Sequence, residues 1–205
     1  MVPVDIPMGE SSAKPRLPHF YIPKDIGPFF DSLVLALFKL SKRSSAGEVL
    51  KKDPNLKNEE AVSRGLAYLA YIGVVTRKKG GYELEEKGRQ IGVALIENRA
   101  DQVDLLWRGV LQAHKLHSLV EEYITEEGAG VRGSSIGLGE FIRRKAGEKW
   151  KSHFVKEGGK RLAKLFQSKG LVGYDEQDDS IKLSVPAGTV TVNIVPSTTV
   201  VTNAS

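Results

Sequence analysis

Hydrophobic residues near the start of the chain recur at the spacing of a helix with one buried face. They occupy the i, i+3, i+4, i+7 and i+8 positions of one stretch, namely Phe30, Leu33, Val34, Leu37 and Phe38. Pro28 fits the first turn of this helix, where its missing N–H costs nothing. Ser45 and Glu48 match a capping box, which predicts a second, short helix.

A third helix and a hairpin follow in the sequence. Asn58 can cap the helix, which we expect to end at Gly73. Two β-prone runs, 74–76 and 82–84, then flank the tip Arg77-Lys78-Lys79-Gly80-Gly81. This arrangement predicts a β-hairpin with a basic tip. Three helices followed by a hairpin are the order of a winged helix, which is a variant of the helix-turn-helix.

The second half of the chain shows a similar order. Residues 90–127 are helical in pattern and carry two apolar stripes, one with Val103, Leu106, Trp107 and Val110 and the other with Leu116, Leu119, Val120, Tyr123 and Ile124. A short helix around Phe141 precedes a longer one that ends at Gly170. We expect Gly158-Gly159 to interrupt the helical pattern between them. A second hairpin follows, with an acidic tip at 175–179.

The fold class expected from this order is mainly α-helical with small β-hairpins. We predict two winged-helix-type domains joined by long helices. The expected parts are an extended Pro-rich arm over 1–25, a first winged-helix domain over 26–99, a connecting helix over 100–115, a second, basic winged-helix domain over 116–185, and an uncharged Thr/Val-rich tail over 186–205.

The stretch from Gly73 to Arg89 resembles winged-helix regulators of the MarR and PadR kind. In those regulators a glycine ends the recognition helix and the wing returns on a Tyr-x-Leu strand. A Thr-x-x-Gly-Lys/Arg step then opens the next helix, and here Glu85 stands in the place of the threonine. The resemblance covers about residues 26–99 and implies a DNA-binding domain. The same pattern also occurs in winged helices that bind only proteins.

The distribution of charge points to a polyanionic partner. The whole chain has a net charge of +5, but residues 140–169 alone hold ten Lys and Arg against three Asp and Glu. A basic block of this kind is either a solvated surface or the footprint of a nucleic acid. Together with the winged-helix order, it favours nucleic-acid binding.

One helix of this block has the pattern of a recognition helix. Lys160, Lys164 and Gln167 lie at i, i+4 and i+7, opposite the apolar Leu162 and Phe166. Lysines would contact phosphates, and Gln167 is the candidate for reading a base. The full set of candidate nucleic-acid contacts is Arg143, Arg144, Lys145, Lys149, Lys151, Lys160, Arg161, Lys164 and Gln167 in the second half, and Arg64, Arg77, Lys78 and Lys79 in the first.

The sequence offers little for catalysis. It contains no cysteine, which removes disulfides and thiolate chemistry and fits a reducing, cytoplasmic location. The string 128–133 matches G-x-G-x-x-G, but a helical stretch precedes it where a dinucleotide fold needs a strand. His114, His117 and Glu121 share a helical face without an evident fourth ligand. We therefore expect no enzyme activity, no cofactor and no metal.

The expected partner is double-stranded DNA, as for a transcription regulator or an accessory factor. RNA stays open as a ligand. A tandem winged-helix adaptor that binds proteins is the alternative, favoured by Glu60 and by the acidic second tip. The two apolar stripes between residues 101 and 127 suggest a homodimer, unless both pack within the chain. We expect no membrane association, because the longest apolar run, 33–38, is far too short to span a bilayer.

Overall fold

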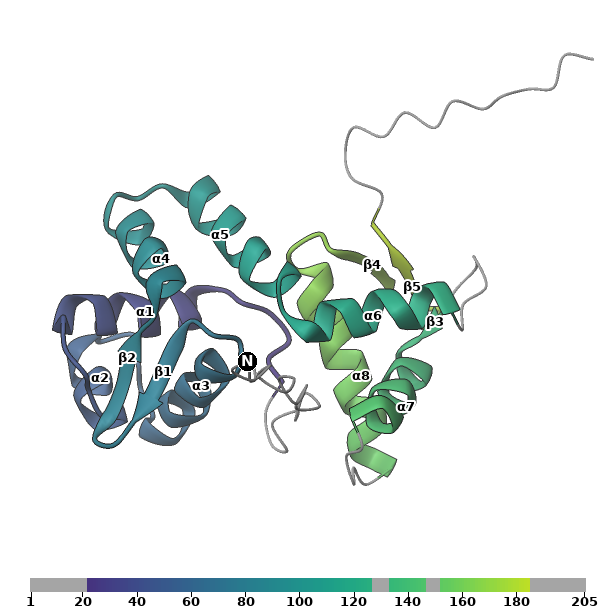
Figure 1. The fold of residues 1–205 in the computed structure, drawn as a ribbon, viewed down its shortest axis with the longest axis horizontal. Coiled ribbons are helices and arrows are strands. Elements are labelled where there is room, and N and C mark those ends of the chain that lie inside the picture. The colour runs from purple at the N-terminus through teal and green to yellow at the C-terminus, as the bar shows by residue number, and fades with distance from the viewer. Residues whose placement is uncertain (1–21, 127–132, 147–151, 185–205) are drawn as a thin grey trace, which may run out of the picture.

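The computed structural model describes residues 22–126, 133–146 and 152–184 (Figure 1). Over these residues the chain is mainly α-helical with small antiparallel sheets, as the sequence predicts. The elements are α1 Pro28–Leu40, α2 Ala46–Lys52, α3 Glu59–Tyr71, β1 Val75–Lys78, β2 Gly81–Leu84, α4 Glu86–Ile96, α5 Ala100–Gln112, α6 Lys115–Glu126, β3 Gly133–Ser134, α7 Ser135–Ala146, α8 Ser152–Gln167, β4 Val172–Asp175 and β5 Ser180–Leu183. Among the helices described, none is long and apolar enough to cross a membrane.

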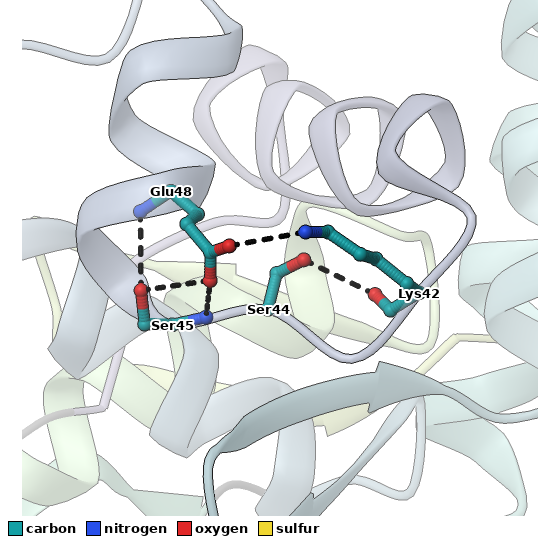
Figure 2. A network of polar contacts seen from close by, with 4 residues as sticks. All are labelled: Lys42, Ser44, Ser45 and Glu48. Atoms are coloured by element: carbon teal, nitrogen blue, oxygen red, sulfur yellow. Dashed lines mark hydrogen bonds and ion pairs between the residues drawn. The ribbon is translucent and has the colours of Figure 1, made fainter.

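The starts of the first three helices follow from local signals in the sequence. Pro28 lies in the first turn of α1, as predicted. The capping box of α2 is also confirmed: the Ser45 hydroxyl accepts the backbone N–H of Glu48, and the Glu48 carboxylate accepts the backbone N–H of Ser45 at 2.8 Å. Lys42 adds an ion pair to the same carboxylate (Figure 2). The Asn58 side chain accepts two backbone N–H groups at the start of α3.

The first hairpin forms a small sheet with a segment that precedes α2. Strands β1 and β2 pair antiparallel, and Lys79 and Gly80 make the turn between them. Ser44 also pairs with Tyr82 of β2, with backbone hydrogen bonds of 3.0 and 2.9 Å. A Cβ atom at Gly81 would lie 2.3 Å from the carbonyl oxygen of Ser44, so glycine is needed for this close approach. The sequence pattern did not predict this third extended segment.

The second half repeats this topology. Helix α6, the short strand β3, helices α7 and α8, and the hairpin β4–β5 follow one another (Figure 1). In the sheet the order is β3-β5-β4, so the segment before the middle helix pairs with the second strand of the hairpin. Ser44 and β2 have the same relation in the first half. The two halves therefore share both element order and strand pairing.

Helix α8 corrects one prediction from the sequence. It runs without a break from Ser152 to Gln167, through Gly158-Gly159, where we expected an interruption. The glycines permit a close crossing of α7 and α8. A Cβ at Gly159 would lie 1.9 Å from the Ser135 carbonyl oxygen, and one at Gly139 would lie 2.1 Å from that of Val155. Tertiary packing thus outweighs the low helix propensity of glycine.

The two halves meet through α5 and α6 in one continuous core. The indole N–H of Trp107 on α5 donates to the Asp31 carboxylate of α1 at 2.8 Å. Lys169, just after α8, pairs with Asp104 of α5 at 2.7 Å. Burial raises the pKa of Asp31, and the hydrogen bond from Trp107 opposes this rise. Polar contacts therefore supplement the apolar packing at this junction.

The apolar stripes of α5 and α6 are covered by the chain itself. Trp107 and Val110 are buried in the first stripe, and Leu116 and Val120 are buried in the second. Leu106 and Leu119 are partly buried against the same core. The account in which both stripes pack within the chain therefore holds. A homodimer through residues 101–127 stays a prediction, and Leu105 of α5 is the apolar residue of the described part of this stretch that is most exposed, at 66%.

Candidate nucleic-acid interface

The first hairpin presents its basic residues to an open concavity. The concavity measures about 730 Å³ and lies between the hairpin tip, the start of α2 and the exposed side of α3. Its lining residues are Ser45, Ala46, Ser63, Arg77, Lys78, Lys79, Gly80, Gly81 and Tyr82. None of these carries a carboxylate. Three of the predicted contact residues thus line one surface together with two serines and a tyrosine.

The cations of this hairpin differ in how they are held. The Arg77 guanidinium lies 5.9 Å from the centroid of the Tyr82 ring, in a cation–π contact. Lys78 pairs with Glu83 at 3.4 Å and lowers the pKa of that carboxyl group. Lys79 has an exposed side chain, while its carbonyl oxygen accepts a hydrogen bond from Arg43 at 3.2 Å. Lys78 is the one tip cation already paired with a carboxylate.

Sequence reasoning missed Arg43 at this surface. It precedes Ser44 and contacts the hairpin in two places, at the Lys79 carbonyl oxygen and, at 3.6 Å, at the Glu83 carboxylate. Its side chain remains substantially exposed. The pairing of Ser44 with Tyr82 brings Arg43 beside the tip, and no local sequence pattern predicts that pairing.

The exposed face of α3 contributes less charge than expected. Arg64 is exposed but forms an ion pair with Glu60 one turn earlier. It does not line the concavity, whereas the small side chain of Ser63 does. Tyr71, near the end of α3, is half-buried with its ring 4.8 Å from that of His114. Only the first part of α3 is thus open to a ligand.

The basic face of α8 is covered by its own hairpin, which corrects the expectation that it projects freely. Lys160 and Lys164 each place their Nζ 2.6 Å from one oxygen of the Glu176 carboxylate. The Gln167 amide donates to the Tyr174 carbonyl oxygen at 2.6 Å, so it is not free to read a base in this arrangement. Arg161 pairs with Glu157 at 2.7 Å. The sequence did show the acidic tip, but not that it folds onto α8.

The remaining predicted residues belong to the end of α7. Arg143 pairs with Glu140 at 2.6 Å, and Lys145 pairs with Glu122 of α6. The Arg144 guanidinium lies 5.6 Å from the centroid of the Phe141 ring. The last two predicted contacts, Lys149 and Lys151, lie outside the described residues. Internal contacts therefore engage the described part of this basic cluster.

The Glu176 carboxyl group should stay ionised well below the pH at which glutamate usually protonates. Hydrogen bonds from Lys160 and Lys164 lower its pKa to about 2, against an ordinary value of about 4.3. Because the folded-state pKa is lowered, this contact stabilises the fold above the ordinary pKa, and its contribution is lost as the pH falls towards about 2. Carboxyl ¹³C NMR from pH ~6 to ~3 should show little titration of Glu176.

The matched control for this titration removes both ammonium groups. With Lys160→Met and Lys164→Met, the pKa of Glu176 should return towards the ordinary value. A midpoint near about 4.3 in the unaltered chain would contradict the two-lysine contact.

The histidines form no metal site in the part of the chain that is described. His117 is buried rather than exposed, and its Nδ1 lies 3.5 Å from the Glu121 carboxylate. Burial lowers the pKa of both His117 and His114. Across the described ranges, no group of three potential ligands gathers closely enough to hold a metal ion.

The string 128–133 ends in the short strand β3. It follows helix α6, as expected, and all of it except Gly133 lies outside the described residues. Helix α7 begins at Ser135, two residues after the end of the string.

Comparisons of the chain with known protein families, with curated proteins and with solved structures find no match.

Proposed function

We propose that the chain binds double-stranded DNA through the first hairpin and α3, and that each half is a winged helix. The observation that carries the proposal is the open concavity in which Arg77, Lys78 and Lys79 meet Ser63 without a carboxylate in the lining. In the first half Arg77 and Lys79 at the hairpin tip are exposed and form no ion pair with any carboxylate of the described residues, whereas Lys78 is paired with Glu83 at 3.4 Å. In the second half the matching surface is occupied by Glu176.

The winged-helix assignment draws support from the repeated topology. Each half has a helix, a short extended segment, two helices and a hairpin, in that order. In each half the extended segment pairs with the second hairpin strand. A helix-turn-helix places its second helix in the major groove. By this analogy α3 is the recognition helix of the first half, and the hairpin β1–β2 is its wing.

The chemistry of the concavity suits a phosphate backbone. Ammonium and guanidinium groups bind phosphate oxygens with charge-assisted hydrogen bonds, and serine hydroxyls also bind them. Ser63 lies in this lining, so its hydroxyl could contact a backbone, whereas the Ser45 hydroxyl already donates to the Glu48 carboxylate at 3.0 Å. Ala67, one turn after Ser63, is small and leaves room for α3 to approach a groove. These contacts give affinity and register but little sequence selectivity.

Duplex DNA fits this surface better than duplex RNA does. The major groove of B-form DNA admits an α-helix, whereas that of A-form RNA is too deep and narrow for one to read. The exposed first part of α3 beside the hairpin tip therefore favours DNA. A protein partner is the competing function, because winged helices also serve as adaptors.

A salt titration with a short duplex tests the proposal. Fluorescence anisotropy with a ~20-base-pair DNA should show binding that weakens steeply between ~50 and ~200 mM salt. Three phosphate contacts from the wing predict a slope of log affinity against log salt of about −3. An RNA duplex of the same sequence should bind more weakly. Absence of DNA binding at ~50 mM salt would overturn the proposal and favour the adaptor.

A further inference from the structure

The second half contains an anion site that is already filled. Two ammonium groups, one turn apart on α8, hold the two oxygens of a single carboxylate. The lysines are about one-third exposed, and Glu176 is about half exposed. A phosphodiester also has two non-bridging oxygens that share one negative charge. The same pair of ammonium groups can therefore hold it in place of the carboxylate.

We propose that Lys160 and Lys164 form a second phosphate-binding site, which Glu176 occupies until a phosphodiester of bound nucleic acid displaces it. This inference rests on the proposed function, because nucleic acid is its ligand. It adds a contact surface on the second half and a reason why that surface is closed in the free chain.

Displacement needs only a rotation of one side chain. The backbone near the tip is held by contacts that do not involve the Glu176 carboxylate: Gln167 bonds the Tyr174 carbonyl oxygen, and Asp175 accepts the backbone N–H of Gln177. The Tyr174 hydroxyl donates to Asp179 at 3.0 Å. Because these contacts persist without Glu176, its side chain can swing into water while the hairpin stays folded.

The whole tip resembles a short stretch of polyanion. Asp175, Asp178 and Asp179 accompany Glu176 in the five residues 175–179. Of these four carboxylates, that of Glu176 lies against the cationic face of α8, where a nucleic-acid backbone would otherwise bind. Electrostatic repulsion between the acidic tip and an incoming nucleic-acid backbone therefore opposes binding, in addition to the occupancy of the site by Glu176. The same charge limits the gain expected from neutralising one residue.

The test compares charge removal at two places in the tip of the full-length chain. Glu176→Gln frees the lysines, whereas Asp175→Asn removes the same charge from a side chain that caps the N–H of Gln177. With the ~20-base-pair duplex, Glu176→Gln should steepen the salt slope by about two units and raise affinity roughly tenfold at ~50 mM salt. Asp175→Asn should change the slope by less than one unit. Thermal unfolding checks that both variants fold.

Removal of the lysines provides the second arm. Lys160→Met with Lys164→Met should weaken binding less in the unaltered chain than in the Glu176→Gln variant, because breaking the contacts with Glu176 offsets most of the gain from the phosphodiester there. The same pair of changes should abolish the gain in the Glu176→Gln background. The inference fails if Glu176→Gln behaves like Asp175→Asn. It also fails if the lysine changes weaken binding equally in both backgrounds.

The arms separate this inference from the proposed function. Binding by the unaltered chain with no effect of Glu176→Gln overturns the inference alone. Binding by the Glu176→Gln variant but not by the unaltered chain supports the α8 site and overturns the wing as the main interface. No binding by either overturns both.

Discussion

Replacing Gly159 with alanine is expected to lower the stability of the fold by about 3 kcal/mol or more. Alanine normally stabilises a helix over glycine by up to about 1 kcal/mol. Here the added Cβ would lie 1.9 Å from the Ser135 carbonyl oxygen and 2.8 Å from the Gly139 nitrogen. Both are backbone atoms, so α7 and α8 must separate to make room. Differential scanning calorimetry should show a melting temperature lower by roughly 6–12 °C.

Gly109 supplies the matched control. It lies within α5, and a Cβ there would meet nothing within 4 Å. Gly109→Ala should therefore raise stability slightly, by up to about 1 kcal/mol, because only the helix-propensity effect remains. The two variants carry the same chemical change and should move the melting temperature in opposite directions. An unchanged or higher melting temperature for Gly159→Ala would show that α7 and α8 do not cross this closely.

Local signals in the sequence predicted the helix starts but not this crossing. The capping box at Ser45 and the cap at Asn58 act within a few residues, so their patterns can be recognised directly. Gly159 acts through Ser135, on another helix. Helix propensity accounts for the destabilising effect of glycine on an isolated helix. It does not account for a close helix crossing that requires glycine. The predicted break in α8 was wrong for that reason.

In the candidate site, too, the sequence predicted the local features but not the contacts between distant segments. The basic hairpin tip was predicted from residues that are adjacent in sequence, and Arg77 to Lys79 do share one surface. Lys160 and Lys164 were placed correctly on one face of a helix, but their partner Glu176 comes from the next hairpin. Helical periodicity shows which side chains point away from the core on the same face of a helix. It does not show which later segment of the chain will cover them.

Removing the three cations of the wing tip should cause the largest loss of DNA affinity. With Arg77, Lys78 and Lys79 all changed to alanine, the salt slope should become shallower by about three units. Affinity at ~50 mM salt should fall roughly a hundredfold or more, because each phosphate contact releases a counterion. Folding should be little affected, since all three side chains are exposed. Anisotropy with the ~20-base-pair duplex measures both quantities.

A second triple variant separates this surface from general charge. Lys87, Arg89 and Arg99 are exposed cations on or beside α4, which starts at the base of the hairpin, away from its tip (Figure 1). Their replacement by alanine changes the net charge by the same amount as the wing variant. If the wing binds phosphates, the α4 variant should alter the slope by less than one unit. Equal losses in both variants would mean that DNA responds to the overall charge of the chain. The concavity beside α3 would then have no special part in binding.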